Sequence, residues 1–334
     1  MMKAIFLCEK ESTLRSVYSV EVTERLKSTA GICDKVFCKK DVLEALENFA
    51  QTEYVFSTWG MPSFTKEEIK TLFPSLKCVF YAAGTVQKFA RPFIECGVSI
   101  FSAWAANAVP VSEYTLSQIL LSNKGFFAHA REMKARNLAL CREMKEKYPG
   151  NYSERVGLIG VGMIGSMVAK RLREYDLRVC AYDPFLSDER ARALGVERCS
   201  LEEVFSSCRV VSNHLADNEQ TRGMLDYSLF SRMMPYSTFI NTGRGAQVVE
   251  EDLVRVLSER EDITALLDVT YPEPSPEGHP FYALPNCILT PHIAGSLARE
   301  THRMAEYMIE EFHRYQSSEP TLYRVSEEML ATMA

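Results

Sequence analysis

Apolar residues in the first hundred positions follow two different periods along the chain. Short continuous runs rich in Val, Ile, Phe and Tyr predict strands at Lys3–Leu7, Lys35–Cys38, Tyr54–Ser57, Cys78–Tyr81 and Val98–Phe101. Between these runs, apolar residues recur every three or four positions and predict helices over Val42–Ala50 and Phe89–Cys96. Alternating strands and helices of this kind are typical of a parallel sheet that is covered by helices.

The pattern changes at Pro110. From there to Tyr148 the sequence is first apolar and then rich in charge, without a strand-like run, and it predicts one or two long helices. After the turn Pro149-Gly150-Asn151, a second series of strands is predicted at Arg155–Ile159, Arg178–Tyr182, Val210–His214, Thr238–Asn241, Ala265–Val269 and Cys287–Thr290. A last helical pattern is carried by Met304, Met308, Ile309 and Phe312. The expected fold class is therefore α/β, with two parallel sheets.

The composition fits a globular chain of two domains. With 334 residues, 46% of them apolar and 25% charged, the chain can bury two cores and is not disordered. A net charge of −6 without a basic stripe argues against a nucleic-acid partner. Every apolar stretch falls short of the ~18 residues that span a membrane, and the first residues lack a signal-peptide pattern. A cytoplasmic protein without membrane association is expected.

The ten cysteines are scattered along the chain without C-x-x-C spacing. In a cytoplasmic chain of this size we expect reduced, mostly buried thiols rather than a disulfide framework. The sequence contains neither the His and Cys spacing of a zinc site nor the G-x-S-x-G motif of serine hydrolases. No metal site is therefore predicted.

A glycine motif directly follows the predicted strand Arg155–Ile159. In this G-x-G-x-x-G pattern, Gly160 allows a tight turn, Gly162 lets the backbone approach a pyrophosphate, and Gly165 permits close packing of helix and strand. Phosphates are favoured at the N-terminus of the helix that follows, because its N–H groups are unpaired and its dipole attracts anions. The segment predicts a dinucleotide site formed by Gly160, Gly162, Met163, Ile164 and Gly165.

An acidic residue ends the next predicted strand. Asp183 comes 18 residues after Gly165 and is placed to accept hydrogen bonds from the ribose hydroxyls of adenosine. Its negative charge would repel a 2′-phosphate, so NAD is favoured over NADP as the cofactor. The alternative is a glycine-rich turn in some other kind of α/β sheet.

Arg244, Glu273 and His292 each lie in a loop that follows a predicted strand, where α/β sheets bind their ligands. Reduction of a 2-oxo acid needs a cation for the carboxylate, an acid for the developing alkoxide, and a group that keeps this acid charged. A carboxylate beside an imidazole raises the pKa of the imidazole, so Glu273 and His292 fit as the acid pair and Arg244 fits as the cation. For each residue taken alone, a solvated loop side chain is the alternative.

Together these segments resemble the D-isomer-specific 2-hydroxyacid dehydrogenase family. The matching stretches besides the glycine motif are Asn213-His214-Leu215-Ala216, Asn241-Thr242-Gly243-Arg244-Gly245, Leu267-Asp268-Val269 with Glu273-Pro274, and Thr290-Pro291-His292-Ile293-Ala294-Gly295. The resemblance implies two doubly wound α/β domains with the active site between them. A Rossmann NAD-binding domain would comprise residues 105–297, and a flavodoxin-like substrate domain would combine residues 1–104 and 298–334.

The resemblance also implies a role for each matched residue. Arg244 would bind the substrate's carboxylate and carbonyl oxygen, His292 would be the general acid and base, and Glu273 would be its partner. Residues at the cofactor would include His214, Thr242, Asp268 and His292, with Asp268 at the nicotinamide carboxamide and His214 in a structural hydrogen bond rather than in proton transfer. Residues at the substrate would include Trp59, Ala83, Gly84, Thr85 and Asn107.

The resemblance favours hydride transfer between NAD(H) and a small D-2-hydroxy acid or its 2-oxo acid, in a homodimer formed through the NAD-binding domain. Transcriptional corepressors share this fold and keep the same three residues, so an NAD-sensing binding module is the alternative. Formate oxidation is disfavoured, because formate dehydrogenases of the family usually carry Gln where Glu273 stands. The family also commonly has Ala at the position of Gly243. The sequence does not predict which side chain the substrate carries.

Overall fold

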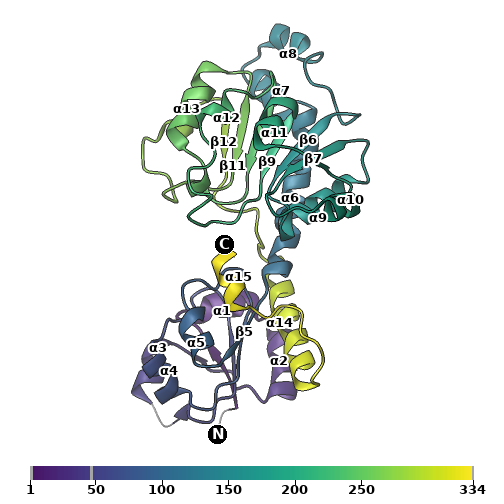
Figure 1. Cartoon of the computed structure of the whole chain (residues 1–334). Helices are drawn as coiled ribbons and strands as arrows, with labels where there is room; N and C mark the ends of the chain where they lie inside the picture. The colour runs from purple at the N-terminus through teal and green to yellow at the C-terminus, as the bar shows by residue number, and fades with distance from the viewer. Residues whose placement is uncertain (1–2, 46–47, 333–334) are drawn as a thin grey trace. The chain divides into compact units, whose positions relative to one another are not determined.

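The computed structural model describes residues 3–45 and 48–332, which are drawn in Figure 1. The chain divides into two compact units. We call Met1–Asn107 with Ser296–Ala334 the terminal unit, and Ala108–Gly295 the central unit. The chain passes from the terminal to the central unit within helix α6 (Trp104–Asn123). Substrate binding by the terminal unit and cofactor binding by the central unit stay predictions, as do the predicted domain boundaries.

A parallel sheet of five strands forms the centre of the terminal unit, in the order β2-β1-β3-β4-β5. The strands are β1 (Ala4–Leu7), β2 (Val36–Phe37), β3 (Tyr54–Ser57), β4 (Cys78–Tyr81) and β5 (Ser99–Ser102). The helices are α1 (Glu11–Val17), α2 (Val20–Ala30), α3 (Lys39–Glu44), α4 (Lys66–Leu72), α5 (Ala90–Glu95), α14 (Glu300–Gln316) and α15 (Glu327–Thr332). Two clusters of buried apolar side chains fill this unit, as a sheet with covered faces requires.

Helix α14 from the end of the chain packs in the same unit as the N-terminal strands. Its predicted apolar positions are all buried in one cluster with the sheet: Met304, Met308, Ile309 and Phe312. The Phe312 ring lies 5.4 Å from the Phe56 ring and 5.6 Å from the Phe80 ring. Figure 1 shows α14 in yellow beside α2 in purple. The hydrophobic effect thus holds the two ends of the chain together in one core.

The central unit contains a parallel sheet of seven strands in the order β12-β11-β10-β9-β6-β7-β8. The strands are β6 (Arg155–Ile159), β7 (Arg178–Tyr182), β8 (Glu197–Arg198), β9 (Val210–Asn213), β10 (Thr238–Asn241), β11 (Thr264–Leu267) and β12 (Cys287–Leu289). Further helices are α7 (Phe126–Lys134), α8 (Leu138–Met144), α9 (Met163–Leu172), α10 (Asp188–Leu194), α11 (Leu201–Ser207), α12 (Tyr227–Phe230) and α13 (Glu250–Glu259). The chain order reverses at β6, which lies between β7 and β9, and sheets of this type bind ligands at such a switch point.

The region from Pro110 to Tyr148 differs from the prediction of one or two helices. It contains parts or all of three, and the first, α6, begins at Trp104 and runs through Pro110. Gly125 separates α6 from α7 with a φ of 64°. A Cβ at Gly125 would lie 2.3 Å from the Tyr148 ring, so a residue 23 positions away leaves no room for a side chain at the break.

Two smaller differences concern one strand and one helix. Strand β8 has two exposed residues and was not predicted, because it is too short to show alternation. Helix α3 comprises Lys39–Glu44, so it begins before the predicted Val42–Ala50 and ends within it. The N–H of its N-cap Cys38 donates to the Asp41 carboxylate, as in a capping box. Positions 46 and 47 of that predicted helix lie outside the described residues.

Among the helices of residues 3–45 and 48–332, none is long and apolar enough to span a membrane.

Candidate active site

The loop between β6 and α9 has the close backbone contacts that its glycines predict. Gly160 has a φ of 84°, and a Cβ there would lie 2.8 Å from the carbonyl oxygen of His214. A Cβ on Gly165 would lie 2.1 Å from the carbonyl oxygen of Gly160, so only glycine permits this approach. Around Gly162 an added Cβ would meet no heavy atom within 4 Å. The middle glycine therefore borders open space, as a backbone that receives a pyrophosphate requires.

The first turn of α9 offers free donors at the same place. Within the described part of the chain, the N–H groups of Met163 and Ile164 donate to no protein acceptor, whereas the N–H of Ser166 donates to the carbonyl oxygen of Gly162 at 3.0 Å. Such unpaired N–H groups, with the positive end of the helix dipole, favour an anion. The loop and the helix start thus fit the diphosphate of a dinucleotide.

Asp183 ends β7 beside the glycine loop. Its Oδ2 accepts the N–H of Val161 at 2.7 Å, and its Oδ1 accepts the N–H of Phe185 at 2.8 Å. Nη2 of Arg190 donates to the carbonyl oxygen of Val161 at 2.5 Å and to Oγ of Ser166 at 3.1 Å. The Asp183 carboxylate therefore binds the N–H of Val161, and the Arg190 guanidinium binds the carbonyl oxygen of the same residue. The sequence pattern did not single out Arg190, which lies on α10.

Two predicted cofactor residues, His214 and Thr242, are buried at the ends of β9 and β10. Nε2 of His214 lies 3.0 Å from Oγ of Ser212, while its Nδ1 has no hydrogen-bond partner in the described structure. Burial lowers the pKa of His214 from 6.5 to about 4, so its ring is neutral near pH 7 and cannot act as a proton donor there. The Oγ1 atoms of Thr242 and Thr115 lie 3.3 Å apart.

Arg244 follows β10 in a loop that is held by buried amide side chains. Nδ2 of Asn213 donates to Oδ1 of Asn241 at 3.0 Å and to Oε1 of Gln247 at 2.6 Å. Nδ2 of Asn241 donates to the carbonyl oxygen of Arg244 at 3.1 Å, and Oε1 of Gln247 accepts the N–H of Arg244 at 3.3 Å. The three amides are at most 1% exposed. They fix the backbone of Arg244 and leave its guanidinium half-buried, donating to the carbonyl oxygen of Gly243.

The glycines on either side of Arg244 have different structural reasons. A Cβ on Gly243 would lie 2.9 Å from Oε1 of Gln247, so the amide cluster occupies the space that the family's usual alanine would need. A Cβ on Gly245 would lie 2.1 Å from the carbonyl carbon of Thr270. Gly245 therefore lets the arginine loop touch the backbone of the segment that leads to Glu273.

Glu273 and His292 form a hydrogen-bonded pair. Nδ1 of His292 donates to Oε1 of Glu273 at 2.7 Å, because an ionised carboxylate can only accept. Both side chains remain accessible, with exposed fractions of 46% for His292 and 40% for Glu273. The bond leaves Nε2 as the ring nitrogen that can exchange a proton with a ligand. The structure thus brings together two of the three predicted catalytic residues.

Asp268 holds the backbone on which His292 lies. This carboxylate is 2% exposed, and its Oδ1 accepts Oγ1–H of Thr290 at 2.6 Å and the N–H of Ile293 at 2.8 Å. Its Oδ2 accepts the N–H of Ala294 at 2.8 Å, and the N–H of His292 donates to the Asp268 carbonyl oxygen at 3.0 Å. His292 itself has a φ of 53°, a conformation that costs free energy for a residue other than glycine. The surrounding hydrogen bonds therefore determine where its ring lies.

The loops of Arg244, Asp268 and His292 leave one edge of the sheet side by side. Strands β10, β11 and β12 are consecutive neighbours, and the pairs Asn241↔Leu267 and Leu267↔Leu289 are in register. Parallel strands that end at the same level place their following loops together. One unit therefore carries the glycine loop, the arginine and the acid–base pair.

Apart from Arg244, the predicted substrate residues lie in the terminal unit. Ala83 is fully buried, and its N–H and carbonyl groups are already bonded to Tyr81 and Ala103. Within the described residues, the N–H groups of Gly84 and Thr85 donate to no protein acceptor. Nδ2 of Asn107 lies 4.0 Å from an ideal Cβ on Gly84, while its Oδ1 accepts the N–H of Ser296. The free donors of this turn are thus those of Gly84 and Thr85.

Trp59 is 39% exposed at the end of β3, and its carbonyl oxygen accepts the thiol of Cys8 at 3.2 Å. Its predicted place at the substrate stays a prediction.

The sequence interpretation missed the positioning roles of Gln247 and Arg190. The side chain of Gln247 reaches both the arginine loop and, through Nε2, the carbonyl oxygen of Leu215 at 2.8 Å. Neither residue belongs to a motif with a fixed spacing, so only tertiary contacts reveal them.

Comparison with known proteins identifies the family of the chain. The family profile described as D-isomer specific 2-hydroxyacid dehydrogenase, NAD binding domain, matches residues 116–294. YoaD of Bacillus subtilis, named among the 2-hydroxyacid dehydrogenases, is 39% identical over 153 residues, which are 45% of this chain and 44% of YoaD. Formate dehydrogenase of Chaetomium thermophilum is 30% identical over 218 residues, 63% of this chain and 59% of the relative. The chain therefore spans only about half of the length of these curated relatives.

A solved structure shares the fold. D-mandelate dehydrogenase of Rhodotorula graminis, in its apo form, superposes with a TM-score of 0.78 at 20% sequence identity, covering 98% of each chain. At this identity the likeness establishes the two-domain α/β architecture alone.

Proposed function

Because the chain belongs to the D-isomer-specific 2-hydroxyacid dehydrogenase family, whose NAD-binding domain it contains, we propose that it transfers a hydride between NAD(H) and a small D-2-hydroxy acid or its 2-oxo acid. The observation that carries this proposal is the His292–Glu273 hydrogen bond of 2.7 Å, next to the arginine loop and in the same unit as the glycine loop. These residues supply an acid–base pair, a cation and a dinucleotide cradle.

The side chains divide the chemistry among them. The bound nicotinamide would give the hydride in reduction and take it in oxidation. Nε2 of His292 donates a proton to the substrate oxygen as that oxygen becomes an alkoxide, and takes it back in oxidation. Glu273 keeps the proton of Nδ1 in place and stabilises the imidazolium by its charge. Arg244 binds the substrate carboxylate and orients the carbonyl oxygen, because a guanidinium donates two parallel hydrogen bonds.

Turnover with purified protein tests the proposal. NADH oxidation is measured over glyoxylate, hydroxypyruvate, pyruvate, longer 2-oxo acids and sugar-derived keto acids, and NAD reduction is measured with the two enantiomers of each hydroxy acid and with formate. We expect turnover with at least one 2-oxo acid and oxidation of the D enantiomer only. If NADH binds but no acid is turned over, the protein is an NAD-sensing module instead. Turnover of formate alone would also contradict the proposal.

We further propose that NAD rather than NADP is the cofactor, because Asp183 presents a carboxylate beside the glycine loop. Asp183→Ala is expected to weaken NADH binding by about 10-fold or more, since a hydrogen bond to a charged group contributes roughly 1.5–3 kcal/mol. The same change should improve NADPH binding, because repulsion of the 2′-phosphate is removed and the Arg190 guanidinium remains nearby. Dissociation constants for both cofactors measure the ratio.

The matched control is Asp188→Ala, since Asp188 is an exposed acid on the neighbouring helix and pairs with Arg198. Its NADH to NADPH ratio should equal that of the unchanged protein. An unchanged ratio in Asp183→Ala itself would show that selectivity depends on other residues.

We also propose a homodimer through the central unit. Its helices α7 and α8 expose three large apolar side chains: Phe126 at 50%, Met133 at 54% and Leu138 at 52%. Exposed apolar side chains on neighbouring helices are typical of association surfaces. Sedimentation velocity should give about twice the chain mass of 37.9 kDa, and a monomer would contradict the proposal.

A further inference from the structure

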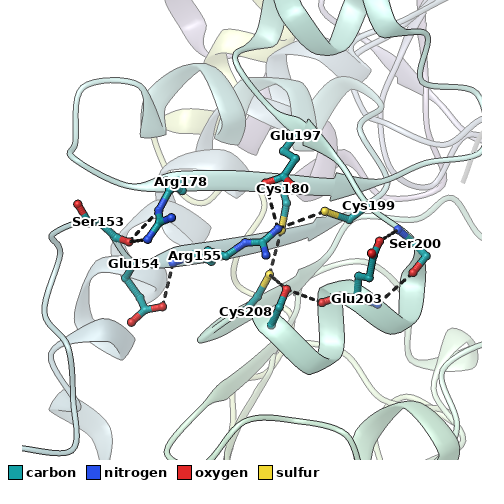
Figure 2. A network of polar contacts seen from close by, with 11 residues as sticks. Ser153, Glu154, Arg155, Arg178, Cys180, Glu197, Cys199, Ser200, Glu203 and Cys208 are labelled. Atoms are coloured by element: carbon teal, nitrogen blue, oxygen red, sulfur yellow. Dashed lines mark hydrogen bonds and ion pairs between the residues drawn. The ribbon is translucent and has the colours of Figure 1, made fainter.

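Three cysteines lie around Arg155 of β6, on the side of the seven-stranded sheet that ends with β7 and β8 (Figure 2). Cys180 lies on β7, Cys199 directly follows the edge strand β8, and Cys208 directly follows α11. Nη2 of Arg155 lies 3.4 Å from Sγ of Cys199 and 3.0 Å from Oε2 of Glu197. The proposed function uses none of these thiols.

Two of the sulfur atoms are close enough to react with each other. Sγ of Cys180 and Sγ of Cys208 lie 2.9 Å apart, and both side chains are fully buried. A disulfide bond is about 2.05 Å long, so the sulfurs need to approach by less than about 1 Å. We propose that Cys180 and Cys208 are a reversible oxidation site, which forms a disulfide with hydrogen peroxide as the oxidant.

The sheet itself creates the space for this pair. Gly157 on β6 is the register partner of Cys180 on β7. A Cβ on Gly157 would lie 3.1 Å from Sγ of Cys208 and 2.6 Å from Cγ1 of Val204. A larger residue at position 157 would therefore displace α11, which carries Val204, and Cys208 directly after it. Glycine at this central position lets the Cys208 thiol lie over the sheet and reach Cys180.

The charges around the pair favour a thiolate on Cys208. A hydrogen bond from Cys180 lowers the pKa of the Cys208 thiol, whereas this bond and burial raise the pKa of Cys180. The Arg155 guanidinium adds a nearby positive charge, which also stabilises a thiolate. Of the two thiols, Cys208 is therefore the one that we assign as the nucleophile, and Cys180 donates the hydrogen bond between them.

For a small oxidant, we expect the route to the buried pair to run through local opening at the edge of the sheet. Strand β8 is the outermost strand, has two residues, and both are exposed. Local opening costs least where few contacts hold the backbone, and such an edge strand pairs with a neighbour on one side only. Cys199, which is partly exposed, directly follows β8 and lies beside Arg155.

The chemistry balances with one peroxide for each pair. The Cys208 thiolate attacks one oxygen of hydrogen peroxide, so that an S–O bond forms, the O–O bond breaks, and the released hydroxide takes up a proton as water. The Cys180 sulfur then attacks the sulfenic sulfur, an S–S bond forms, and the S–O bond breaks with release of a second water. Two thiols lose two electrons and two protons, and the peroxide is reduced to two waters.

Peptide mapping of the full chain tests the site. The protein is treated with about one equivalent of hydrogen peroxide, alkylated under denaturing conditions, and digested. Trypsin releases Cys180 on residues 179–190 but leaves Cys199 and Cys208 together on residues 199–209, so cleavage after Glu202 or Glu203 is needed to separate them. We expect two of the ten thiols to be lost, a linked pair of Cys180 and Cys208, and full recovery with a dithiol reductant.

Cys208→Ser is expected to abolish the linked pair, and Cys141→Ser, which removes a buried thiol on α8, is the control that should keep it. Mapping of the unchanged protein does not depend on whether either variant folds. A link between Cys180 and Cys199 instead, or peroxide consumption without any linked peptide, would overturn the proposal. Loss of dehydrogenase activity is not the readout, so the result is independent of the proposed function.

Discussion

Replacing His292 by glutamine is expected to lower kcat by about 10²- to 10⁴-fold and to leave NADH binding almost unchanged. Glutamine can still donate a hydrogen bond to Glu273, but it cannot release a proton to an alkoxide near pH 7. The glycine loop and Asp183, which carry the predicted contacts to the diphosphate and the adenosine ribose, lie after other strands and keep their hydrogen bonds. Steady-state kinetics on an accepted 2-oxo acid and a fluorescence titration with NADH separate the two effects.

His313→Gln is a suitable control, because His313 is an exposed histidine on α14 in the terminal unit. It should keep the kcat of the unchanged protein. Turnover of His292→Gln within a few fold of that value would exclude His292 as the proton donor. His214 does not offer a second route, since its buried ring is neutral at the pH of the assay.

Asp268→Asn should reduce kcat by about 10-fold or more and lower the free energy of unfolding by about 2–4 kcal/mol. The buried carboxylate accepts hydrogen bonds from Thr290, Ile293 and Ala294, and an amide has only one oxygen with which to accept them. Its NH₂ group would instead face a backbone N–H, so one donor would remain unpaired in a buried position. The loop that holds the His292 ring should then lose its fixed position.

Asp262→Asn is the matched control, since Asp262 precedes β11 and accepts hydrogen bonds from Tyr236 and Arg260. It should lose stability as well, but its kcat and the dependence of kcat on pH should not change. Denaturant titration gives the stability of both variants, and pH–rate profiles of kcat report on the acid–base pair. Equal kcat in the two variants would limit Asp268 to a structural role.

Most strands could be predicted from the sequence because each is a buried run of apolar residues. The predicted bounds of Tyr54–Ser57, Cys78–Tyr81 and Thr238–Asn241 agree with β3, β4 and β10. In a parallel sheet both faces are covered, so hydrophobicity alone marks these segments. The family and its two-sheet α/β fold could also be predicted, because the glycine motif and the loops after the strands keep fixed local spacing.

The helices between Trp104 and Met144 could not be predicted in the same way. Gly125 at the helix break packs against the distant Tyr148 ring, and α6 continues through a proline that in sequence predicts a helix end. Strand β8 exists because it pairs with β7, not because its two exposed residues favour a strand. The packing at Gly125 and the pairing of β8 both involve partners that are distant along the chain.

The sequence by itself determined which residue types are available for catalysis, because Arg244, Glu273 and His292 stand in loops whose local patterns are recognisable. Only the tertiary structure decided how they are held: Glu273 against His292, Asp268 under the His292 loop, and three buried amides around Arg244. It also decided that two cysteines 28 positions apart meet over Gly157. Spacing along a chain records local geometry, whereas these contacts result from parallel strands that end at one level and from side chains that share one buried space.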